Sequence, residues 1–308
     1  MTDSVRWIDL CEPDRDALMK AAPRAEDLHP RALDQLLEPA RHNDEPRPTM
    51  ESHGDYVFGV FLVPVAEAAT DTIFYQEIDL VLTRTVVLTV RKRPAEGKPA
   101  FEWSDAREVY ERGNLHSTAM VAYHLVDDIA ERFLDLTDTL NDEIDELEDH
   151  IDGWPNERTR GRLSTLRHDL LHIRRTLAPT RDAVRRIVDN RVELDGAELF
   201  SRDVELHFAD AYDKLLRASE ALELSRDLVA GVRDYHQSKI ANDQNEVMKR
   251  LTVIASLLLL PTFIVGLYGQ NFVNIPELRW HWGYGYVWVV IVVTTAMQLW
   301  WFRKNRWF

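Results

Sequence analysis

Two long apolar runs near the C-terminus are the clearest feature of the hydrophobic and polar pattern. Leu251 to Leu267 and Tyr286 to Phe302 each extend over 17 residues without a charged side chain. A helix of about this length crosses most of the hydrocarbon core of a bilayer. The pattern therefore predicts two membrane helices, and a lipid bilayer is the first partner that we expect.

Basic residues flank the two runs on the sides away from the segment that joins them. Lys249 and Arg250 precede the first run, and Arg303, Lys304 and Arg306 follow the second. Because Lys and Arg are enriched on the cytoplasmic side of membrane helices, both termini are expected in the cytoplasm. The segment between the runs would then face outward, with its Trp and Tyr residues in the headgroup layer. We expect a multi-pass protein of the inner (plasma) membrane.

The first part of the chain has a β pattern interrupted by short helical segments. Apolar and β-branched residues dominate three stretches that Pro and Gly punctuate, which predicts strands in an α/β layer. These stretches are Tyr56 to Val65, Glu77 to Leu82 and Thr85 to Arg91.

From about His116 the pattern becomes helical, with apolar residues at every third or fourth position. The first helix is expected to end near Gly153, and a second, from about Asn156 to Asn190, is expected to pack against it as an antiparallel hairpin. A third helical stretch begins near Gly196 and contains no proline before Pro261. We expect one continuous helix of roughly 70 residues, which at about 1.5 Å per residue is on the order of 100 Å long.

These patterns predict an α+β cytoplasmic domain with a long helical stalk and two C-terminal transmembrane helices. The expected segments are a cytoplasmic α/β domain (1–115), a helical hairpin (116–195), a stalk helix that continues into the first membrane helix (196–267, with about 251–267 in the membrane), an outer loop (268–285), a second membrane helix (286–302) and a basic tail (303–308).

Charge and cysteine content narrow the class of protein. The net charge is -15, and the membrane part is neutral to basic, so the acidic residues belong to the cytoplasmic part. A single cysteine, Cys11, excludes an internal disulfide and fits a reducing compartment. No basic stripe is available to displace counterions from phosphate, so we expect no nucleic-acid partner. A net negative charge makes divalent cations more suitable partners than nucleic acid.

A polar stripe runs along the long helix into the first apolar run. Small side chains can serve close packing of membrane helices, which is one interpretation. However, two spans per chain cannot enclose a pore, so polar groups at membrane depth are best satisfied when several copies face a wet axis. Steps of three and four residues give Asp234, Ser238, Ala241, Asn245, Met248, Thr252, Ala255, Leu259, Thr262, Gly266 and Gly269.

Two other classes of protein were weighed. His168 and His172 stand at metal-ligand spacing on one helix, but Asp169 replaces the Glu of the zincin pattern and no third ligand is apparent. No Gly-rich phosphate loop or nucleophile arrangement stands out, so we expect neither an enzyme nor a small-molecule substrate. A membrane-tethered scaffold would have no use for polar rings at membrane depth.

Several motifs together resemble one family. The chain closely resembles the CorA family of two-span GxN divalent-cation transporters, which implies a homopentamer with a cytoplasmic funnel and a pore lined by the first span of each subunit. The motifs are Tyr-Gly-Gln-Asn-Phe at 268–272, Pro-Glu-Leu-Arg-Trp at 276–280, Trp-Gly-Tyr at 282–284, Asn-Glu-Val-Met-Lys at 245–249 and the basic tail that contains Trp307.

The resemblance implies a role for each ring of the pathway. Asn271, together with Gly269 and Gln270, resembles the outer ring whose amide oxygens hold a hydrated cation. Binding of the hydrated ion suits Mg²⁺, because this ion loses its bound water reluctantly. Thr262 corresponds to a polar ring in mid-membrane, and Asp234 to an acidic ring nearer the cytoplasm. Asn245 corresponds to a further polar ring, and Met248 and Leu251 to the apolar constriction that closes the pore by dewetting.

The chain departs from the family pattern at two positions. Gln270 replaces the usual methionine, which leaves open whether Mg²⁺ (with Co²⁺ and Ni²⁺) or Zn²⁺ is the main substrate of passive conduction driven by the membrane potential. Gln35 replaces one acid of a pair that helps to bind regulatory Mg²⁺ between subunits. Its expected partner is Asp210, with Asp34 as a substitute. Another acidic pair near that interface is Asp127 and Asp128.

Overall fold

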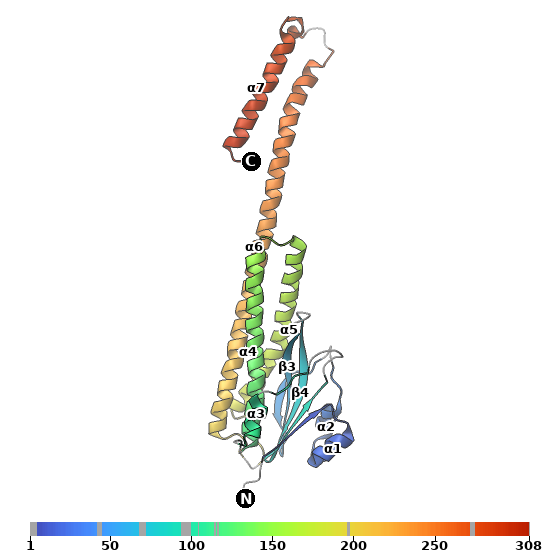
Figure 1. Ribbon diagram of the computed structural model, residues 1–308, viewed down its shortest axis with the longest axis vertical. Helices are drawn as coiled ribbons and strands as arrows, with labels where there is room; N and C mark the ends of the chain where they lie inside the picture. Colours follow the sequence, from blue (N-terminus) through green and yellow to red (C-terminus); the bar gives the residue numbers. More distant parts are fainter. Residues whose placement is uncertain are drawn as a thin grey trace. The chain divides into compact units, whose positions relative to one another are not determined.

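The computed structural model describes residues 5–41, 45–67, 72–93, 100–103, 105–113, 115, 117–195, 198–271 and 275–307 (Figure 1). The chain divides into two compact units, Met1–Gly231 and Val232–Phe308, which are described separately. Phe272 of the predicted outer motif lies outside the described residues, and so do the starting points predicted at His116 and Gly196.

The first unit contains a five-stranded sheet with the order β1-β5-β4-β3-β2. Strand β1 is parallel to β5, and the other neighbours are antiparallel. The three predicted stretches lie in β3, β4 and β5, whereas β1 and β2 were not predicted. The strands are β1 (Arg6–Cys11), β2 (Thr49–Ser52), β3 (Val57–Glu67), β4 (Thr72–Leu82) and β5 (Val86–Arg91).

Short helices cover one face of the sheet (Figure 1). Leu18 and Leu36 of these helices pack with Ile8, Val81 and Val90 of the strands, and all five are buried. Alternate strand residues point to opposite faces, so the remaining apolar positions face the other side. The short helices are α1 (Arg15–Ala21), the 3₁₀ helix η1 (Pro23–Asp27) and α2 (Pro30–Leu37).

Long helices cover the other face. α4 (Thr118–His150) and α5 (Asn156–Val188) form a hairpin that contacts the sheet, with α3 (Asp105–Glu111) against α4. Ser117 caps α4 because its Oγ accepts a hydrogen bond from the Met120 amide at 3.1 Å. The apolar residues predicted from helical periodicity are buried, which holds the hairpin together: Leu125, Ile129, Phe133, Leu136, Leu140, Ile144 and Leu147.

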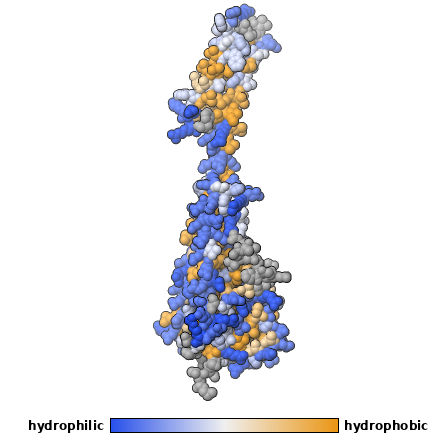
Figure 2. Space-filling model, in the orientation of Figure 1, coloured by the Kyte–Doolittle hydropathy of each residue, from blue (hydrophilic) through white to orange (hydrophobic). Residues whose placement is uncertain are grey.

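Helix α6 (Arg202–Tyr268) is continuous over 67 residues and contributes to both units. It begins six positions after the predicted start at Gly196, and it includes Pro261 without ending there. After η2 (Pro276–Arg279), helix α7 (Gly283–Lys304) completes the chain. Among the described residues, α6 and α7 are the helices that are long and apolar enough to cross a membrane. Apolar residues gather on their surface in Figure 2.

Candidate ion pathway and candidate metal sites

The outer end of α6 carries the predicted tripeptide. The Gly269 amide donates to the Val265 carbonyl at 2.9 Å, and the Gln270 amide donates to the Leu267 carbonyl at 3.4 Å. A Cβ atom at Gly269 would lie 3.2 Å from the Val265 oxygen, which is tighter than ordinary contact. Glycine therefore suits this position, where the helix ends. Gln270 and Asn271 follow, and both are exposed.

An aromatic cavity of about 600 Å³ lies beside this tripeptide, between the end of α6, the outer loop and α7. Trp280 stacks edge-on against Tyr286, with ring centroids 5.8 Å apart. Trp282 and Tyr284 are about four-fifths exposed, as residues of a headgroup layer would be. The cavity is lined by Val265, Tyr268, Gly269, Trp280, His281, Gly283, Tyr284, Val287, Trp288 and Ile291.

Two faces of α6 differ in the second unit. Val253 and Ile264 are buried, and the Ser256 carbonyl accepts a hydrogen bond from Gln298 of α7 at 3.5 Å. α7 therefore covers this face. The predicted polar stripe lies on another face and is exposed: Met248 and Leu251 are about two-thirds exposed. Asn245, Thr252, Ala255, Leu259, Thr262, Gly266 and Gly269 are exposed as well.

The threonines of the stripe are satisfied within the helix. Thr252 Oγ1 donates to the Met248 carbonyl at 2.8 Å, and Thr262 Oγ1 donates to the Leu258 carbonyl at 2.7 Å. Each hydroxyl thus uses its proton internally, and its oxygen lone pairs remain as acceptors. Such a group can accept a hydrogen bond from the water of a hydrated cation.

Asp234 lies near the start of the stripe and is exposed. Its Oδ1 is 3.0 Å from the guanidinium of the adjacent Arg233. An exposed ion pair of this kind contributes little, because water screens both charges. Asp234 therefore keeps most of the solvated, acidic character that the sequence predicted.

Gln35 points into its own chain. Its Nε2 donates to Glu77 Oε1 at 2.8 Å, so the side chain that replaces an expected acid is bound to an acid of β4. Asp34, the substitute, lies on the same helix and is exposed.

A buried cluster that the sequence analysis missed lies behind Gln35. Lys92 is 1% exposed and its Nζ donates to the carbonyls of Gln35, Leu36 and Glu38, at the end of α2. The same Nζ lies 3.1 Å from Asp79 Oδ2. An ammonium is the natural partner for helix C-terminal carbonyls. The signal that could have revealed the cluster is an acid inside an apolar strand with a lysine at the end of the next strand.

The pKa values of both acids of this cluster are raised in the folded chain. Burial raises the pKa of Asp79 to about 8, although Lys92 opposes the shift and Glu77 adds to it. Burial also raises the pKa of Glu77, again against the effect of Lys92. Lys92 therefore acts on both carboxyl groups but contacts only that of Asp79, whose protonation changes near neutral to mildly alkaline pH.

Two of the other predicted acidic residues have partners within the chain, and the third is exposed. Asp127 Oδ1 lies 2.8 Å from the Lys214 ammonium. Asp128 is buried and its Oδ2 accepts from the Ala106 amide, at the start of α3, at 3.3 Å. Asp210 is exposed on α6. Within the described part of the chain, no three His, Cys, Asp or Glu residues come together as a metal site.

The histidine pair of the zinc hypothesis has other contacts. The rings of His168 and His172 are 6.3 Å apart. His172 Nε2 lies 3.9 Å from Glu45 Oε2, and its ring stacks edge-on against Tyr75 at 4.8 Å. These contacts account for His172 as part of the packing between α5 and β4.

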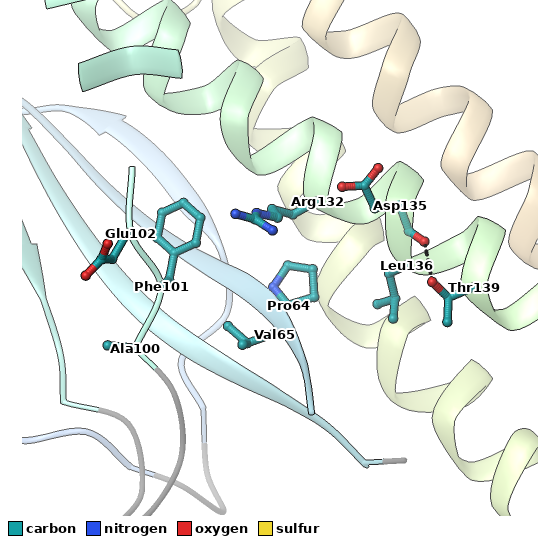
Figure 3. A pocket seen from close by; sticks show the side chains of 9 residues that line it. All are labelled: Pro64, Val65, Ala100, Phe101, Glu102, Arg132, Asp135, Leu136 and Thr139. Atoms are coloured by element: carbon teal, nitrogen blue, oxygen red, sulfur yellow. Dashed lines mark hydrogen bonds between the residues drawn. The ribbon is translucent and has the colours of Figure 1, made fainter. Parts of the chain in front are cut away.

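A second cavity, of about 360 Å³, lies between β3, the segment 100–102 and α4 (Figure 3). The Arg132 guanidinium lies over the Phe101 ring at 5.5 Å, and Thr139 donates its hydroxyl hydrogen bond to the Asp135 carbonyl at 2.9 Å. None of the residues predicted for a site lines this cavity. It belongs to the packing of the hairpin on the sheet.

The fold and the exposed stripe define a class: a membrane protein in which one helix runs from an α+β domain into the first of two C-terminal spans. The chain belongs to the family described as CorA-like Mg²⁺ transporter protein, whose model matches residues 2–304. This family consists of membrane transporters, so the expected fold class and family are confirmed and an enzymatic role is not supported.

Individual relatives agree with this assignment. The cobalt/magnesium transport protein CorA of Thermotoga maritima is 29% identical over 303 residues, which cover 98% of this chain and 83% of the relative. The zinc transport protein ZntB of Yersinia pseudotuberculosis is 28% identical over 188 residues, which cover 60% of this chain and 56% of the relative.

Solved structures support the fold. The complete CorA magnesium transporter of Methanocaldococcus jannaschii has a TM-score of 0.78 at 19% identity, with 98% of this chain and 91% of that chain covered. The full-length CmaX protein has a TM-score of 0.71 at 23% identity, with coverage of 98% and 88%.

Proposed function

We propose that this chain forms a homopentameric channel in the inner membrane that conducts Mg²⁺ passively, with Co²⁺ and Ni²⁺ as further substrates and both termini in the cytoplasm. The observation that carries the proposal is the exposed stripe of α6, which ends at Asn271. α7 covers a different face of α6, so this stripe is available to other copies of the chain. A ring of copies would satisfy its polar groups around a wet axis.

The outer ring is suited to a hydrated ion. Asn271 lies just beyond the end of α6, where its side chain is exposed and its amide oxygen can accept hydrogen bonds. Mg²⁺ keeps its water shell unless a rigid octahedral site replaces it, so binding through water is the less costly mode. Thr262 then offers a second acceptor within the span.

The constriction lies nearer the cytoplasm. Met248 and Leu251 are exposed on the stripe face, one turn apart on the helix. Apolar side chains from several copies would form a neck that excludes water when narrow. We place the gate there, with closure favoured by cytoplasmic divalent cations bound between subunits near Asp34 and Asp210.

The membrane potential is a sufficient driving force. One elementary charge that falls through 100 mV gains about 2.3 kcal/mol, so a divalent cation gains roughly 4.6 kcal/mol. Uptake therefore needs no nucleotide hydrolysis, and flux should follow the potential.

Zn²⁺ is the second candidate substrate. Gln270 stands where the family usually has methionine, next to the outer ring, and ZntB is among the similar proteins. An amide side chain at this position adds hydrogen-bonding groups that methionine lacks, which changes the number of acceptors that face an entering ion.

The first prediction tests the pathway itself. Asn271→Ala should reduce cation flux by about tenfold or more, because a hydrogen bond to a charged species contributes about 1.5–3 kcal/mol and tenfold corresponds to about 1.4 kcal/mol. The measurement is uptake of Mg²⁺, Zn²⁺, Co²⁺ and Ni²⁺ into liposomes at a set membrane potential. Asn242→Ala is the matched control, since this exposed amide on α6 lies outside the stripe. Equal uptake by both variants would defeat the proposal.

A further inference from the structure

A lysine joins two acidic residues across the helices of the first unit. Lys214 of α6 has its Nζ 2.8 Å from Asp127 Oδ1 and 2.5 Å from Glu131 Oε1, both on α4. The side chains of Lys214 and Asp127 are each one-fifth exposed, and that of Glu131 is about half exposed. The ammonium is therefore shared by two carboxylates at a partly buried position, where water screens their charges less than at an open surface.

A third carboxylate lies close to the same place. Asp210 precedes Lys214 by one helical turn on α6. Burial raises the pKa of the half-buried Tyr123 hydroxyl, Asp127 raises it further, Lys214 lowers it, and Asp210 and Glu131 raise it again. Three carboxylates and one ammonium therefore act electrostatically on this hydroxyl.

His124 supplies little positive charge here. The rings of His124 and His207 lie 4.9 Å and 5.1 Å from the ring of Tyr123. Burial lowers the pKa of His124, against the opposite effect of Asp127, so its neutral form is favoured near neutral pH. Lys214 is the cation in direct contact with Asp127 and Glu131 of this cluster.

At this position, a divalent cation and the Lys214 ammonium are alternative ways to neutralise the carboxylates. Carboxylates that converge on one point repel one another unless a cation lies between them. Mg²⁺ requires oxygen ligands at about 2.0–2.1 Å in octahedral geometry and loses water reluctantly. The Lys214 ammonium needs neither octahedral geometry nor the loss of tightly bound water, and the folded chain already holds it beside the carboxylates. The oxygen–nitrogen distances here are those of hydrogen bonds, and the described acids do not form a metal site.

We propose that the Lys214 ammonium takes the place of a divalent cation between α4 and α6, so that the packing of these helices does not depend on cytoplasmic Mg²⁺. The inference rests on the proposed function, because it concerns which acids remain for regulation by a divalent cation. Asp127 and Glu131 are committed to Lys214, so metal-dependent closure would have to use Asp210 and Asp34 between subunits.

The test compares three forms of the full chain in detergent: the parent, Lys214→Gln and Lys214→Arg. Thermal unfolding is followed over a series of Mg²⁺ concentrations, with choline chloride keeping the ionic strength constant. Without Mg²⁺, Lys214→Gln should unfold about 2–4 °C below the parent. Mg²⁺ should restore its melting temperature, and calorimetry should detect one additional bound Mg²⁺ per chain. The parent and Lys214→Arg should show only the Mg²⁺ response of the sites proposed between subunits, without the recovery specific to Lys214→Gln and without the additional bound Mg²⁺.

A further variant tests whether the gained Mg²⁺ response comes from the carboxylates of Asp127 and Glu131. Adding Asp127→Asn and Glu131→Gln to Lys214→Gln should remove the gained Mg²⁺ response, because the oxygen ligands lose their charge. The inference is wrong if Lys214→Gln responds to Mg²⁺ as the parent does, or if the response survives in the combined variant. These measurements do not use flux, so failure of the channel proposal at Asn271 would leave them interpretable.

Discussion

The two halves of α6 differ in what covers their apolar residues. Up to Gly231, the helix buries Phe208, Leu215 and Leu222 within its own unit, although Leu206 and Leu224 remain exposed. From Val232 onward, most large apolar side chains of the helix are exposed rather than buried. Examples are Met248, Leu251, Ile254, Leu258, Leu259, Phe263 and Val265.

This difference indicates where the partners of each half lie. An apolar surface of this extent on an isolated chain marks a contact with lipid or protein. The apolar side chains of the first half pack within the sheet-containing unit of the same chain. The stability of this half therefore depends on contacts within one subunit. The second half finds only part of its partners in α7, so an apolar surface remains that suits lipid or another protein surface.

The largest effect on stability should distinguish two phenylalanines on the same helix. Phe208 is fully buried against Tyr123 and Phe200, with ring centroids 5.9 Å and 5.4 Å away. Phe208→Ala should lower the free energy of unfolding by about 3–5 kcal/mol. Phe263→Ala should have little effect in detergent, because that ring is 64% exposed. Thermal unfolding of both variants measures this, and equal losses would erase the distinction between the halves.

An intermediate effect concerns conduction rather than stability. Met248→Ala combined with Leu251→Ala should raise leak at high internal Mg²⁺ on the order of tenfold, which corresponds to about 1.4 kcal/mol, because a wider and less apolar neck dewets less readily. Leu224→Ala is the control, since this leucine of the first half is similarly exposed. Liposome efflux assays would measure the leak. A channel that stayed closed would place the gate elsewhere.

The smaller of the two effects on stability is a pH dependence that belongs to the first unit alone. The folded state raises the pKa of Asp79 to about 8 from its usual value, so the folded chain holds this proton more tightly than the unfolded chain does. Stability should therefore fall as pH rises from about 6 to about 8, by on the order of 1–2 kcal/mol.

The matched variant for this pH dependence is Asp79→Asn, which cannot ionise. The difference in melting temperature between the two pH values should shrink in that variant. An unchanged difference would show that other groups are responsible. The same pH change should leave contacts of the second unit, such as Trp280 with Tyr286, unaffected, as tryptophan fluorescence can test.

Local patterns made the membrane part predictable. The length of an apolar run reflects bilayer thickness, and the stripe from Asp234 to Gly269 follows from helical periodicity. The long helix was also predictable, because few helix breakers interrupt it. The short strands β1 and β2 were missed, since a four-residue strand such as β2 carries almost no periodic signal.

The charged contacts could not be predicted for a different reason. Lys214 pairs with Asp127 across 87 positions of the chain, and Gln35 binds Glu77 across 42. Such pairs depend on how helices and sheet pack, which no local pattern encodes. The family resemblance therefore suggested a regulatory site near Gln35, Asp127 and Asp128, and the sequence did not reveal that these three side chains have partners within the chain.

The link from Lys92 to the end of α2 has a consequence for hydrogen exchange. A helix of eight residues would ordinarily open and close by itself, and its amides would exchange early. The Lys92 ammonium holds the carbonyls of Gln35, Leu36 and Glu38 at the end of α2 and also contacts Asp79 of β4, so opening of α2 would leave this ammonium without three of its partners. We therefore expect the amides of α2 to exchange together with those of the sheet rather than by local fraying.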